Sequence, residues 1–502
     1  MTVVTDNAII KLSNNVFDRN FLTKKEFIEM VENLIVTVTL LKNSDIKDSN
    51  GSQSTINMLI DFGIINVTTE LDLLKKYLGS SLMDKLLISI NDVIREDLLK
   101  YPEISKFHKL SRDLRVSIEN ESDKPTLVDL FCGAGGLSLG LTQENFRVVF
   151  ANDIEKAALR TYLFNHPEID GNRITMGGIE DIAHNVRSYI PEDVDVIAGG
   201  PPCQGFSMAN RQRIIDDPRN ILYKYYVESV KNLLPKFFIM ENVKGMKSVA
   251  HQVVEDFNKN VPIGYDISFD VFNARHFGIP QNRERLIYIG IREDIREKFQ
   301  TSAEDIIQSI RDSYSPIEQG LMDAIGSLQK LEALRDKNST DSENDISGYK
   351  ISLKNKKVEN EYVTLINNGK VINLIFNHKA RYNNDRDIEI FGRMFPGDKS
   401  DSPRIADIMP YISRNHVFKD KYFKLLPDLP CKTITAHMKF DCNMYIHPFQ
   451  ARGLTPREAA RVQSYPDDYF FLGPYTKTYQ QIGNSVPPMM ARVFANKIKN
   501  FL

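Results

Sequence analysis

Three short segments hold the residues whose types and spacing are best suited to chemistry. The first passes from an apolar run into a glycine-rich turn and reads Asp129-Leu130-Phe131-Cys132-Gly133-Ala134-Gly135-Gly136-Leu137-Ser138. Small residues let the backbone approach a ligand there, and the helix that follows offers free amide donors. Asp153 ends the next apolar run, where such folds hold a ribose hydroxyl. The glycine spacing is not that of a dinucleotide fold, so the turn predicts a nucleoside-containing cofactor, with a tight structural turn as the alternative.

The other two segments offer a nucleophile and an acid. Gly199-Gly200-Pro201-Pro202-Cys203-Gln204-Gly205-Phe206-Ser207 follows directly on an apolar run. A lone cysteine is most often a small buried hydrophobe, but these prolines and glycines fix the loop and leave little bulk to bury the Cys203 thiol. An accessible thiolate is a nucleophile. Met240-Glu241-Asn242-Val243 ends the next apolar run. The Glu241 carboxyl is therefore a candidate for proton transfer beside the cysteine loop, although an isolated glutamate of this kind is usually a surface residue.

These segments need a scaffold that brings them together. From Thr126 onward, short apolar runs alternate with amphipathic segments, which is typical of an α/β domain with a mostly parallel sheet. We expect strands over 127–131, 147–152, 194–198, 237–240 and 286–291, and a helix over 222–233. Each motif follows a strand, and sites in α/β folds lie at the carboxyl ends of the strands. The motifs are therefore predicted to meet at one edge of the sheet.

The composition of the chain is that of an ordinary globular protein. Its 502 residues are 42% hydrophobic and 26% charged, which is enough for two or three domains. No apolar run is long enough to span a bilayer and no secretory signal is recognisable, so we expect no membrane partner and a cytoplasmic location. The four cysteines have neither disulfide nor metal-ligand spacing, so no metal is expected. The net charge of −2 means that a nucleic-acid surface must gather its positive charge locally.

Taken together, the three segments resemble the signature blocks of the cytosine-5 DNA methyltransferase family, particularly its prokaryotic restriction-modification members. Four further segments match that family in the same order. They are Gln281-Asn282-Arg283-Glu284-Arg285, Thr433-Ile434-Thr435, Leu454-Thr455-Pro456-Arg457-Glu458-Ala459-Ala460-Arg461 and Gly483-Asn484-Ser485-Val486-Pro487-Pro488. The resemblance covers roughly residues 126–292 and 431–502.

The resemblance implies a catalytic set. Cys203 would add to C6 of a cytosine that has been flipped out of double-stranded DNA. Glu241 would hydrogen-bond the ring and stabilise the charge that develops on attack. Arg285 would lie against the base, and Arg283 belongs with it. The chemistry is consistent with these residue types, because C6 is a weak electrophile that needs a thiolate.

The resemblance also implies S-adenosyl-L-methionine as cofactor. Phe131 would lie against the adenine, Asp153 would bind the ribose, and Asp181 would reach the adenine amino group. Many family members carry glutamate at the position of Asp153. Gly133, Gly135 and Gly136 would lie under the methionine part, and Leu222, Asn484 and Ser485 would close the pocket. The other residues expected to bind the cofactor are Asp129, Leu137, Ile154, Ile182 and Pro201.

Four regions are predicted along the chain. Residues 1–122 read as a helical N-terminal extension, residues 123–292 as the Rossmann-like catalytic domain, residues 293–430 as a linker and target-recognition domain, and residues 431–502 as the return to the catalytic domain. Residues 302–334 are expected to be helical. Basic and aromatic residues are interleaved in the third region, with Lys419, Lys421 and Lys424 as candidate phosphate contacts. The role of the extension is left open, with packing favoured over a partner site.

Three other functions remain as alternatives. A tRNA cytosine-5 methyltransferase shares the fold, but the intact Gly205-Phe206-Ser207 favours DNA. A non-catalytic binding protein on the same fold is disfavoured by the intact Cys203, Glu241 and Arg285. A nicotinamide oxidoreductase is poorly supported by the glycine spacing. A restriction-modification or related defence setting would add a cognate endonuclease as a partner, and neither the recognised sequence nor the oligomeric state can be derived.

Overall fold

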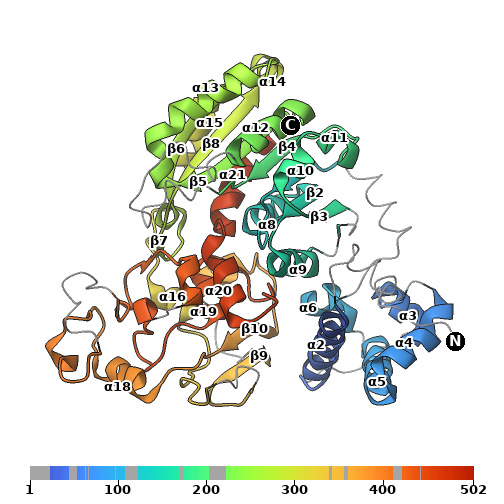
Figure 1. Ribbon diagram of the computed structural model, residues 1–502, viewed down its shortest axis with the longest axis vertical. Helices are drawn as coiled ribbons and strands as arrows, with labels where there is room; N and C mark the ends of the chain where they lie inside the picture. The colour runs from blue at the N-terminus through green and yellow to red at the C-terminus, as the bar shows by residue number, and fades with distance from the viewer. Residues whose placement is uncertain are drawn as a thin grey trace.

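The computed structural model describes most of the chain (Figure 1). The described residues are 23–44, 54–62, 64–65, 67–96, 98–107, 123–166, 168–169, 173–202, 222–337, 342–354, 360–410, 421–440 and 443–502. Among these residues, no helix combines the length and the apolar character that crossing a membrane requires.

A seven-stranded sheet forms the centre of the upper part of the molecule in Figure 1. Its strand order is β3-β2-β1-β4-β5-β8-β6. Only β8 runs antiparallel to its neighbours within this sheet. The α/β fold with a mostly parallel sheet is thereby confirmed. The strands are β1 (Thr126–Leu130), β2 (Arg147–Asp153), β3 (Ile174–Met176), β4 (Val196–Gly199), β5 (Phe237–Val243), β6 (Tyr265–Asn273) and β8 (Glu284–Arg292).

Helices cover both faces of this sheet, because its inner strands alternate apolar side chains between the two faces. In β4, Val196 and Ala198 belong to one apolar core and Ile197 to the other. The first core is completed by α8 (Gly136–Gln143), α9 (Lys156–Asn165), α14 (Glu293–Phe299), α15 (Ala303–Arg311) and α21 (Pro488–Lys499). The second is completed by α10 (Ile179–Ala183), α11 (Val186–Tyr189), α12 (Leu222–Leu233), η5 (Lys244–Val249) and α13 (Ala250–Asn260). We call this unit, residues 123–311 and 485–502, the sheet lobe.

A second unit, the inserted lobe, comprises residues 312–484. Its main core joins α16 (Leu321–Ile325), α17 (Glu361–Ile366), α19 (Pro456–Val462) and α20 (Tyr475–Asn484). The hairpin β9 (Gly348–Leu353) and β10 (Leu374–Lys379) packs beside α19, and a smaller core lies under α18 (Asp385–Arg393) and η7 (Pro403–Ile405). Short elements join the lobes: η6 (Ala274–Phe277), β7 (Gln281–Asn282), β11 (Cys431–Lys432), η9 (Ala436–Lys439) and η10 (Asn443–Tyr445).

The packing divides the chain differently from the boundaries expected at residues 293 and 431. Helices α14 and α15 pack on the sheet, with Ile306 and Ile310 in its core. Residues of α19 and α20 pack with the insertion, and the chain rejoins the sheet only at α21. The expected helix over residues 302–334 is also wrong in extent. Pro316 and Gly320 lie between α15 and α16, and no helix is present from Gly326 to the end of the described stretch at residue 337.

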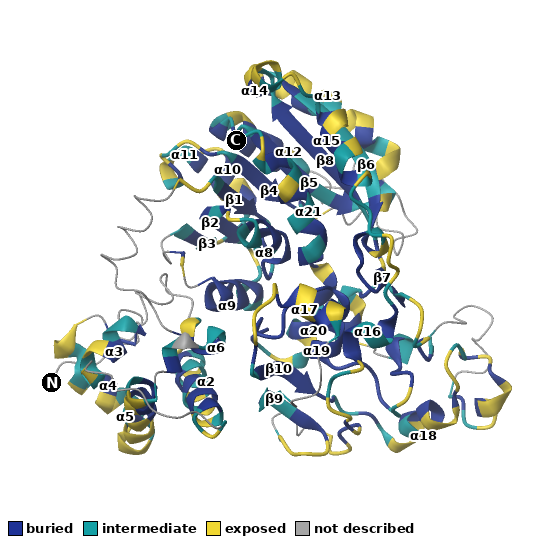
Figure 2. Cartoon of the chain, turned by 180° about the vertical axis from the view of Figure 1, so that it is seen from behind, coloured by how far each residue is buried: buried dark blue, intermediate teal, exposed yellow. Residues whose placement is uncertain are grey.

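Residues 23–107 form a helical unit, as expected for the N-terminus, and we call it the helical extension. It contains α2 (Lys24–Lys42), α3 (Thr55–Asp61), η1 (Thr68–Glu70), α4 (Leu71–Leu78), α5 (Ser80–Arg95), η2 (Leu98–Lys100) and α6 (Pro102–Ser105). Phe27, Val31 and Leu34 recur at helical spacing and are buried at 1%, 0% and 3% exposure. Figure 2 shows the buried inner faces of these helices and the exposed outer ones.

Candidate active site

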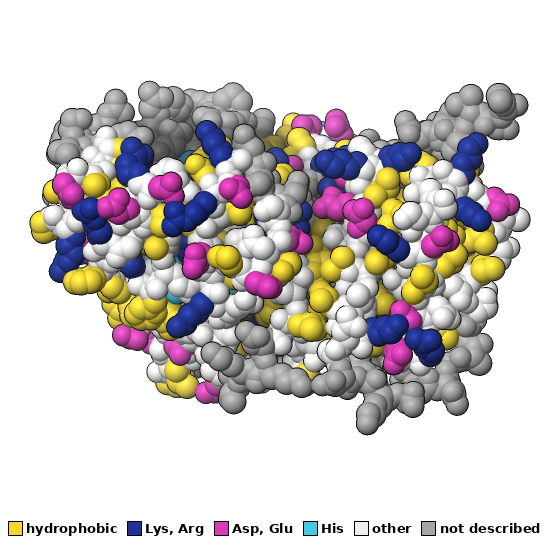
Figure 3. All heavy atoms as spheres, turned by 90° about the horizontal axis from the view of Figure 1, so that it is seen from below, with side chains coloured by type: hydrophobic (Ala, Val, Ile, Leu, Met, Phe, Trp, Pro, Cys, Tyr) yellow, Lys and Arg dark blue, Asp and Glu magenta, His cyan; other side chains and the backbone are white. Residues whose placement is uncertain are grey.

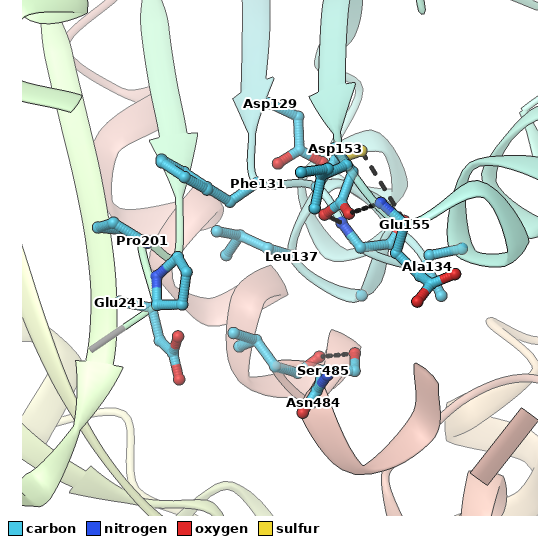
Figure 4. A pocket seen from close by; sticks show the side chains of 18 of the residues that line it. Asp129, Phe131, Ala134, Leu137, Asp153, Glu155, Pro201, Glu241, Asn484 and Ser485 are labelled. Atoms are coloured by element: carbon cyan, nitrogen blue, oxygen red, sulfur yellow. Dashed lines mark hydrogen bonds between the residues drawn. The ribbon is translucent and has the colours of Figure 1, made fainter. Parts of the chain in front are cut away.

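A large cavity opens where the strand order changes direction. From β1 the chain proceeds to β2 and β3 on one side, and it then returns to β4 and β5 on the other. Such a switch point leaves a crevice outside the carboxyl ends of the strands. The cavity has a volume of about 660 Å³, and its walls come from the loops after β1 to β5, from β8 and from α20. In Figure 4, Asp153 and Ala134 lie on one side of it, Pro201 and Glu241 on the other, with Asn484 and Ser485 below.

The glycine-rich turn after β1 is held tightly by the C-terminal part of the chain. Gly133 and Gly135 have φ angles of 54° and 81°, in the left-handed region that favours glycine. A Cβ atom on Gly136 would lie 1.9 Å from Ser485 Oγ and 2.4 Å from the Val486 carbonyl oxygen. On the outer side of the turn, the Tyr469 hydroxyl donates to the Ala134 carbonyl at 2.5 Å. The turn is therefore glycine-rich because another segment packs directly on it.

Asp153 organises the turn from β2. Its Oδ2 accepts a hydrogen bond from the Gly133 N–H at 2.8 Å, and its Oδ1 accepts one from the Glu155 N–H at 2.7 Å. Burial raises the pKa of this carboxyl, while the backbone donors oppose the rise. The next residue, Ile154, is 74% exposed although it lines the cavity. An exposed branched side chain beside a hydrogen-bonding carboxylate suits a ligand with an apolar ring and hydroxyl groups.

Asp129 lies beneath the same cavity at the end of β1. Its side chain is 1% exposed and accepts a hydrogen bond from the Tyr162 hydroxyl at 3.3 Å. Burial raises the pKa of Asp129 to about 7, although hydrogen bonds from Ser138 and Tyr162 oppose the rise. The floor of the cavity therefore carries a carboxyl group that changes its charge near neutral pH.

An ion pair occupies the other end of the cavity. Arg285 Nε lies 2.8 Å from Glu241 Oε1, and the two side chains are only 14% and 12% exposed. They come from the paired strands β8 and β5. The loop after β4 is fixed beside them, because the Asn242 amide donates to the Pro201 carbonyl at 2.9 Å. A Cβ atom on Gly200 would lie 2.7 Å from Glu241 Oε2. This close approach brings the start of the cysteine loop against the carboxylate.

Cys203 itself lies outside the described residues, which resume at Leu222. Pro202 is the last described residue before it and lines the cavity, as does Leu222. The thiols of Cys132 and Cys431 are buried. Burial raises the pKa of Cys132 and raises that of Cys431 to about 12, so neither is a reactive thiolate near neutral pH.

The structure does not bring Arg283 to the cavity. Its side chain is 0% exposed and donates to three carbonyl oxygens, those of Ile434 at 2.7 Å, Gly483 at 3.0 Å and Ser485 at 2.7 Å. It therefore ties the inserted lobe and the Asn484 segment to the edge of the sheet. The catalytic role expected for Arg283 is therefore wrong, and the structure gives this residue an anchoring role. Arg285 lies only two residues away, but it lines the cavity, whereas Arg283 is buried among backbone carbonyls.

Three of the expected cofactor residues also lie away from the cavity lining. Gly135 packs towards Tyr469 and Tyr162. Asp181 is exposed, and Ile182 is 2% exposed within the sheet core, because α10 begins at Ile179 and turns both away. The other expected cofactor residues do line it: Asp129, Phe131, Gly133, Gly136, Leu137, Asp153, Ile154, Pro201, Leu222, Asn484 and Ser485.

Several lining residues were missed by the sequence analysis. Gly178, Ile179 and Glu180 line the cavity in place of Asp181 and Ile182. The signal for them was the Gly177-Gly178 pair, which follows the unpredicted strand β3. A second group of lining residues belongs to no motif: Glu155, Lys477 and Gln480. Lys477 Nζ lies 2.6 Å from Glu155 Oε2 and links the two lobes at the rim.

The expected phosphate contacts of the insertion divide into three cases. Lys424 is 6% exposed, and its Nζ donates to the carbonyls of Phe391 at 2.8 Å and Met394 at 2.9 Å. It is therefore a core residue and not a phosphate contact. Lys419 lies outside the described residues, and Lys421 lies at the edge of the same gap. Figure 3 shows the face formed by the inserted lobe and the helical extension, where basic and acidic side chains alternate. Such alternation does not favour phosphate binding on that face.

Comparison with known proteins identifies close relatives. The sequence model for C-5 cytosine-specific DNA methylases matches residues 126–500. The chain is 32% identical over 402 residues to the type II methyltransferase M.DdeI of Desulfomicrobium norvegicum, covering 74% of this chain and 88% of the relative. It is 26% identical over 479 residues to the type II methyltransferase M.Sau96I of Staphylococcus aureus, covering 92% of this chain and 96% of the relative.

A solved structure extends the likeness to three dimensions. It is the crystal structure of a proposed DNA modification methyltransferase encoded within a prophage of E. coli, with a TM-score of 0.58 and 25% sequence identity. The likeness covers 75% of this chain and 99% of that one. The M.Sau96I match leaves only the remaining 8% of this chain outside it, so it includes most of the N-terminal extension.

Proposed function

The chain belongs to the C-5 cytosine-specific DNA methylase family, and on this premise we propose that it transfers a methyl group from S-adenosylmethionine to C5 of a flipped-out cytosine through a covalent bond between Cys203 and C6. It is a DNA (cytosine-5-)-methyltransferase of the restriction-modification type. The observation that carries the proposal is the meeting of the glycine-rich turn, the Glu241–Arg285 ion pair and the loop leading to Cys203 at one cavity.

The cavity fits the proposed cofactor. Its volume of about 660 Å³ accommodates a nucleoside with an amino-acid tail, and Gly133 faces open space where a side chain would intrude. Phe131 and Ile154 would hold the adenine, and Asp153 would accept from a ribose hydroxyl. Gly178, Ile179 and Glu180 take the place proposed earlier for Asp181 and Ile182. When bound, the cofactor supplies an electrophilic methyl group on a sulfonium sulfur.

The protein groups divide the chemistry at the base. The Cys203 thiolate adds to C6, which makes C5 nucleophilic; after methylation, loss of the C5 proton and departure of Cys203 restore the aromatic ring. Glu241 would hydrogen-bond the N3 and amino edge of the cytosine and stabilise the charge that the ring acquires when the thiolate adds. Arg285 would hold the Glu241 carboxylate in place and lie against the base. The ion pair restrains both side chains, which supports these roles because little reorganisation would then be needed during the reaction.

The proposal extends to DNA and to partners. The target cytosine must leave the duplex, because a ring stacked inside the helix is inaccessible to Cys203. We infer that the inserted lobe reads the DNA sequence and that a cognate restriction endonuclease acts on the same site. An enzyme with this role would work in the cytoplasm, together with the DNA that it protects.

The decisive experiment traps the covalent bond. A DNA duplex that carries 5-fluorocytosine in place of the target cytosine should form a stable adduct with the enzyme and cofactor, because fluorine cannot leave C5 as the proton does. Peptide mass spectrometry should locate the adduct at Cys203. Cys203→Ser should form no adduct and should bind S-adenosylhomocysteine as the wild type does. An adduct at Cys132, Cys431 or Cys442 would refute the assignment.

A further inference from the structure

The helical extension contacts the sheet lobe through charged residues of α2 and α9. Arg160 of α9 lies 3.2 Å from Glu26 and 3.4 Å from Glu29, measured between guanidinium nitrogen and carboxylate oxygen. Lys156 on the same helix lies 3.1 Å from Glu26. The side chains of Arg160 and Glu26 are only 10% and 17% exposed, so water screens this cluster less than an ordinary surface pair. The extension is therefore fastened to a helix of the sheet lobe.

The same extension reaches the inserted lobe through a buried carboxyl group. Glu103 of α6 is 0% exposed, and its Oε1 accepts hydrogen bonds from the backbone N–H groups of Asn373 at 2.5 Å and Leu374 at 2.9 Å. Leu374 is the first residue of strand β10, and Asn373 directly precedes it. Burial raises the pKa of this carboxyl, and Glu103 Oε2 has no hydrogen-bond partner among the described residues. Burying a carboxyl group costs stability unless hydrogen bonds replace its lost hydration, and here only one of the two oxygens accepts such bonds.

An aromatic row continues this contact through both lobes. Phe107 of the extension packs on Phe164 of α9, with ring centroids 4.8 Å apart. Phe164 packs on Phe470 at 5.5 Å, and Phe470 stacks on Phe376 of β10 at 4.8 Å. Beside this row, Lys106 Nζ donates to the Asp468 carbonyl at 2.6 Å. The core of the extension is thus shared with both lobes and is not closed on itself.

The extension does not act on the reacting groups directly. Among the described residues, none between 23 and 107 lines the large cavity. Its contacts fall on α9, on the β9–β10 hairpin and on the segment around Asp468. Figure 1 shows α9 and the hairpin where the three units meet. Any influence on the reaction must therefore pass through the placement of one lobe against the other.

We propose that the helical extension is a brace that sets the position of the inserted lobe on the sheet lobe, and that Glu103 is a positioning residue for DNA recognition. The inference depends on the proposed function, since it takes DNA as the substrate read by the inserted lobe. Loosening the brace at either end lets the reading lobe shift, whereas Arg283 still binds the Gly483 and Ser485 carbonyls and Ser485 still packs on the glycine-rich turn. Affinity for DNA and sequence fidelity then fall while affinity for the cofactor is retained.

The test loosens the brace separately at its two ends. Glu103→Ala removes the acceptor for the β10 amides, whereas Glu103→Gln keeps a carbonyl oxygen there and should restore function. Arg160→Met removes the contacts with Glu26 and Glu29. Lys42→Met is the matched control, because the Lys42–Asp92 ion pair at 3.0 Å lies wholly within the extension. Steady-state kinetics should give a KM for DNA raised on the order of tenfold for Glu103→Ala and for Arg160→Met. Calorimetry should give unchanged binding of S-adenosylhomocysteine for all variants.

Sequencing of methylated cytosines in a random-sequence library should show looser site selection for the same two variants and wild-type selection for Glu103→Gln and Lys42→Met. If Glu103→Ala does not fold, Arg160→Met decides the question alone. A lower melting temperature with unchanged KM for DNA and unchanged site selection would overturn the brace and leave the extension a purely stabilising unit. A wild-type enzyme that methylates no DNA would instead refute the proposed function.

Discussion

At the scale of single residues, the Glu241–Arg285 ion pair stands out because neither side chain is free to relax into solvent. Arg285 is held by Glu241 and by the Glu284 carbonyl, to which its Nη1 donates at 2.7 Å. Burial lowers the pKa of Arg285 and Glu241 opposes that fall, so the guanidinium depends on its partner. Removing one charge leaves the other partly buried and unpaired, which is costlier than the loss of a surface pair.

Arg285→Ala should therefore lower kcat by roughly two to three orders of magnitude, comparable with losing a preorganised donor at a reaction centre. Binding of S-adenosylhomocysteine should change less than threefold, since the glycine-rich turn and Asp153 are untouched. Lys244→Met is the matched control, because it breaks the nearby exposed Lys244–Glu284 pair and should retain wild-type kcat. Radiolabelled methyl transfer to DNA measures kcat, and equal losses in both variants would contradict the role of Arg285.

Asp129 should make the stability of the protein depend on pH. Burial raises its pKa from the ordinary value of 3.8 to about 7, so the folded protein keeps a proton that the unfolded chain releases between these values. This contribution therefore destabilises the wild type increasingly as the pH rises from about 4 to about 7 and is constant above that. The melting temperature of Asp129→Asn should therefore rise relative to that of the wild type as the pH increases over this range. Thermal denaturation between pH 4.5 and 8.5 measures it, and a constant difference would exclude the raised pKa.

At the scale of elements, the glycine-rich turn, the end of β2 and the Asn484 segment behave as one unit. Ser485 and Val486 press on Gly136, Tyr469 holds Ala134, and Asp153 holds Gly133. Each contact joins the loop of one strand to a segment that is distant in the chain. The shape of the cavity beside the glycine-rich turn therefore depends on all of these joined elements and not on the turn alone.

Gly136→Ala should disrupt this unit. The added methyl group would overlap Ser485 Oγ and the Val486 carbonyl, and moving a backbone carbonyl is expensive. We expect a loss of roughly 1–3 kcal/mol in the free energy of unfolding and at least tenfold weaker cofactor binding. Gly392→Ala in α18 is the control, because nothing lies within 4 Å of its added Cβ. Unfolding in urea and calorimetry provide both values, and wild-type cofactor binding by Gly136→Ala would contradict the packing argument.

The elements that could be predicted are those whose sequence signal lies within a single short segment of the chain. Alternating apolar runs indicated β1, β2, β4, β5 and β8, and the glycines identified the turn at the switch point. Strands β3 and β6 were missed. β3 has only three residues, and six of the nine residues of β6 are only partly buried, so neither gives a strong apolar signal.

The residues that could not be predicted are those whose roles depend on distant partners. Arg283 and Arg285 are equivalent in the sequence, but only Arg283 meets three carbonyls from segments more than 150 residues away. Lys424 resembles a surface lysine in the sequence, but in the structure its Nζ donates to the carbonyls of Phe391 and Met394. The expectation for Asp181 rests on the family resemblance alone. In the structure α10 begins at Ile179 and leaves Asp181 exposed, and Gly178, Ile179 and Glu180 line the cavity instead.

At the scale of the whole molecule, the helical extension completes a core that belongs to three units. Phe164, Ile351, Leu374, Phe376, Phe470 and Leu472, all outside the extension, are at most 8% exposed within this shared cluster. Removing the extension would expose their side chains together as one apolar patch. The extension is therefore not a separable domain, although the sequence shows a clear change of texture at its end.

A chain that begins at residue 123 should accordingly aggregate. Light scattering should detect particles larger than the monomer at micromolar concentration, and binding of a hydrophobic dye should rise relative to the full chain. The full-length Arg160→Met variant serves as the control, since it weakens one attachment without uncovering the apolar cluster. A truncated protein that remained monodisperse and bound S-adenosylhomocysteine would show that the lobes close this surface unaided.

The contact between Tyr469 and Ala134 has a consequence for how the protein is made. The two residues are 335 positions apart, and α21, which completes one face of the sheet, begins at Pro488. A ribosome adding about 5–20 residues per second needs on the order of half a minute to travel that distance. Once the ribosome has passed Arg285, the growing chain carries Cys203, Glu241 and Arg285. The cavity at the switch point is not yet closed at that stage, and one face of the sheet is only partly covered. Methylating capacity therefore requires that α21 has been synthesised, and until then the unfinished chain offers chaperones an apolar sheet face.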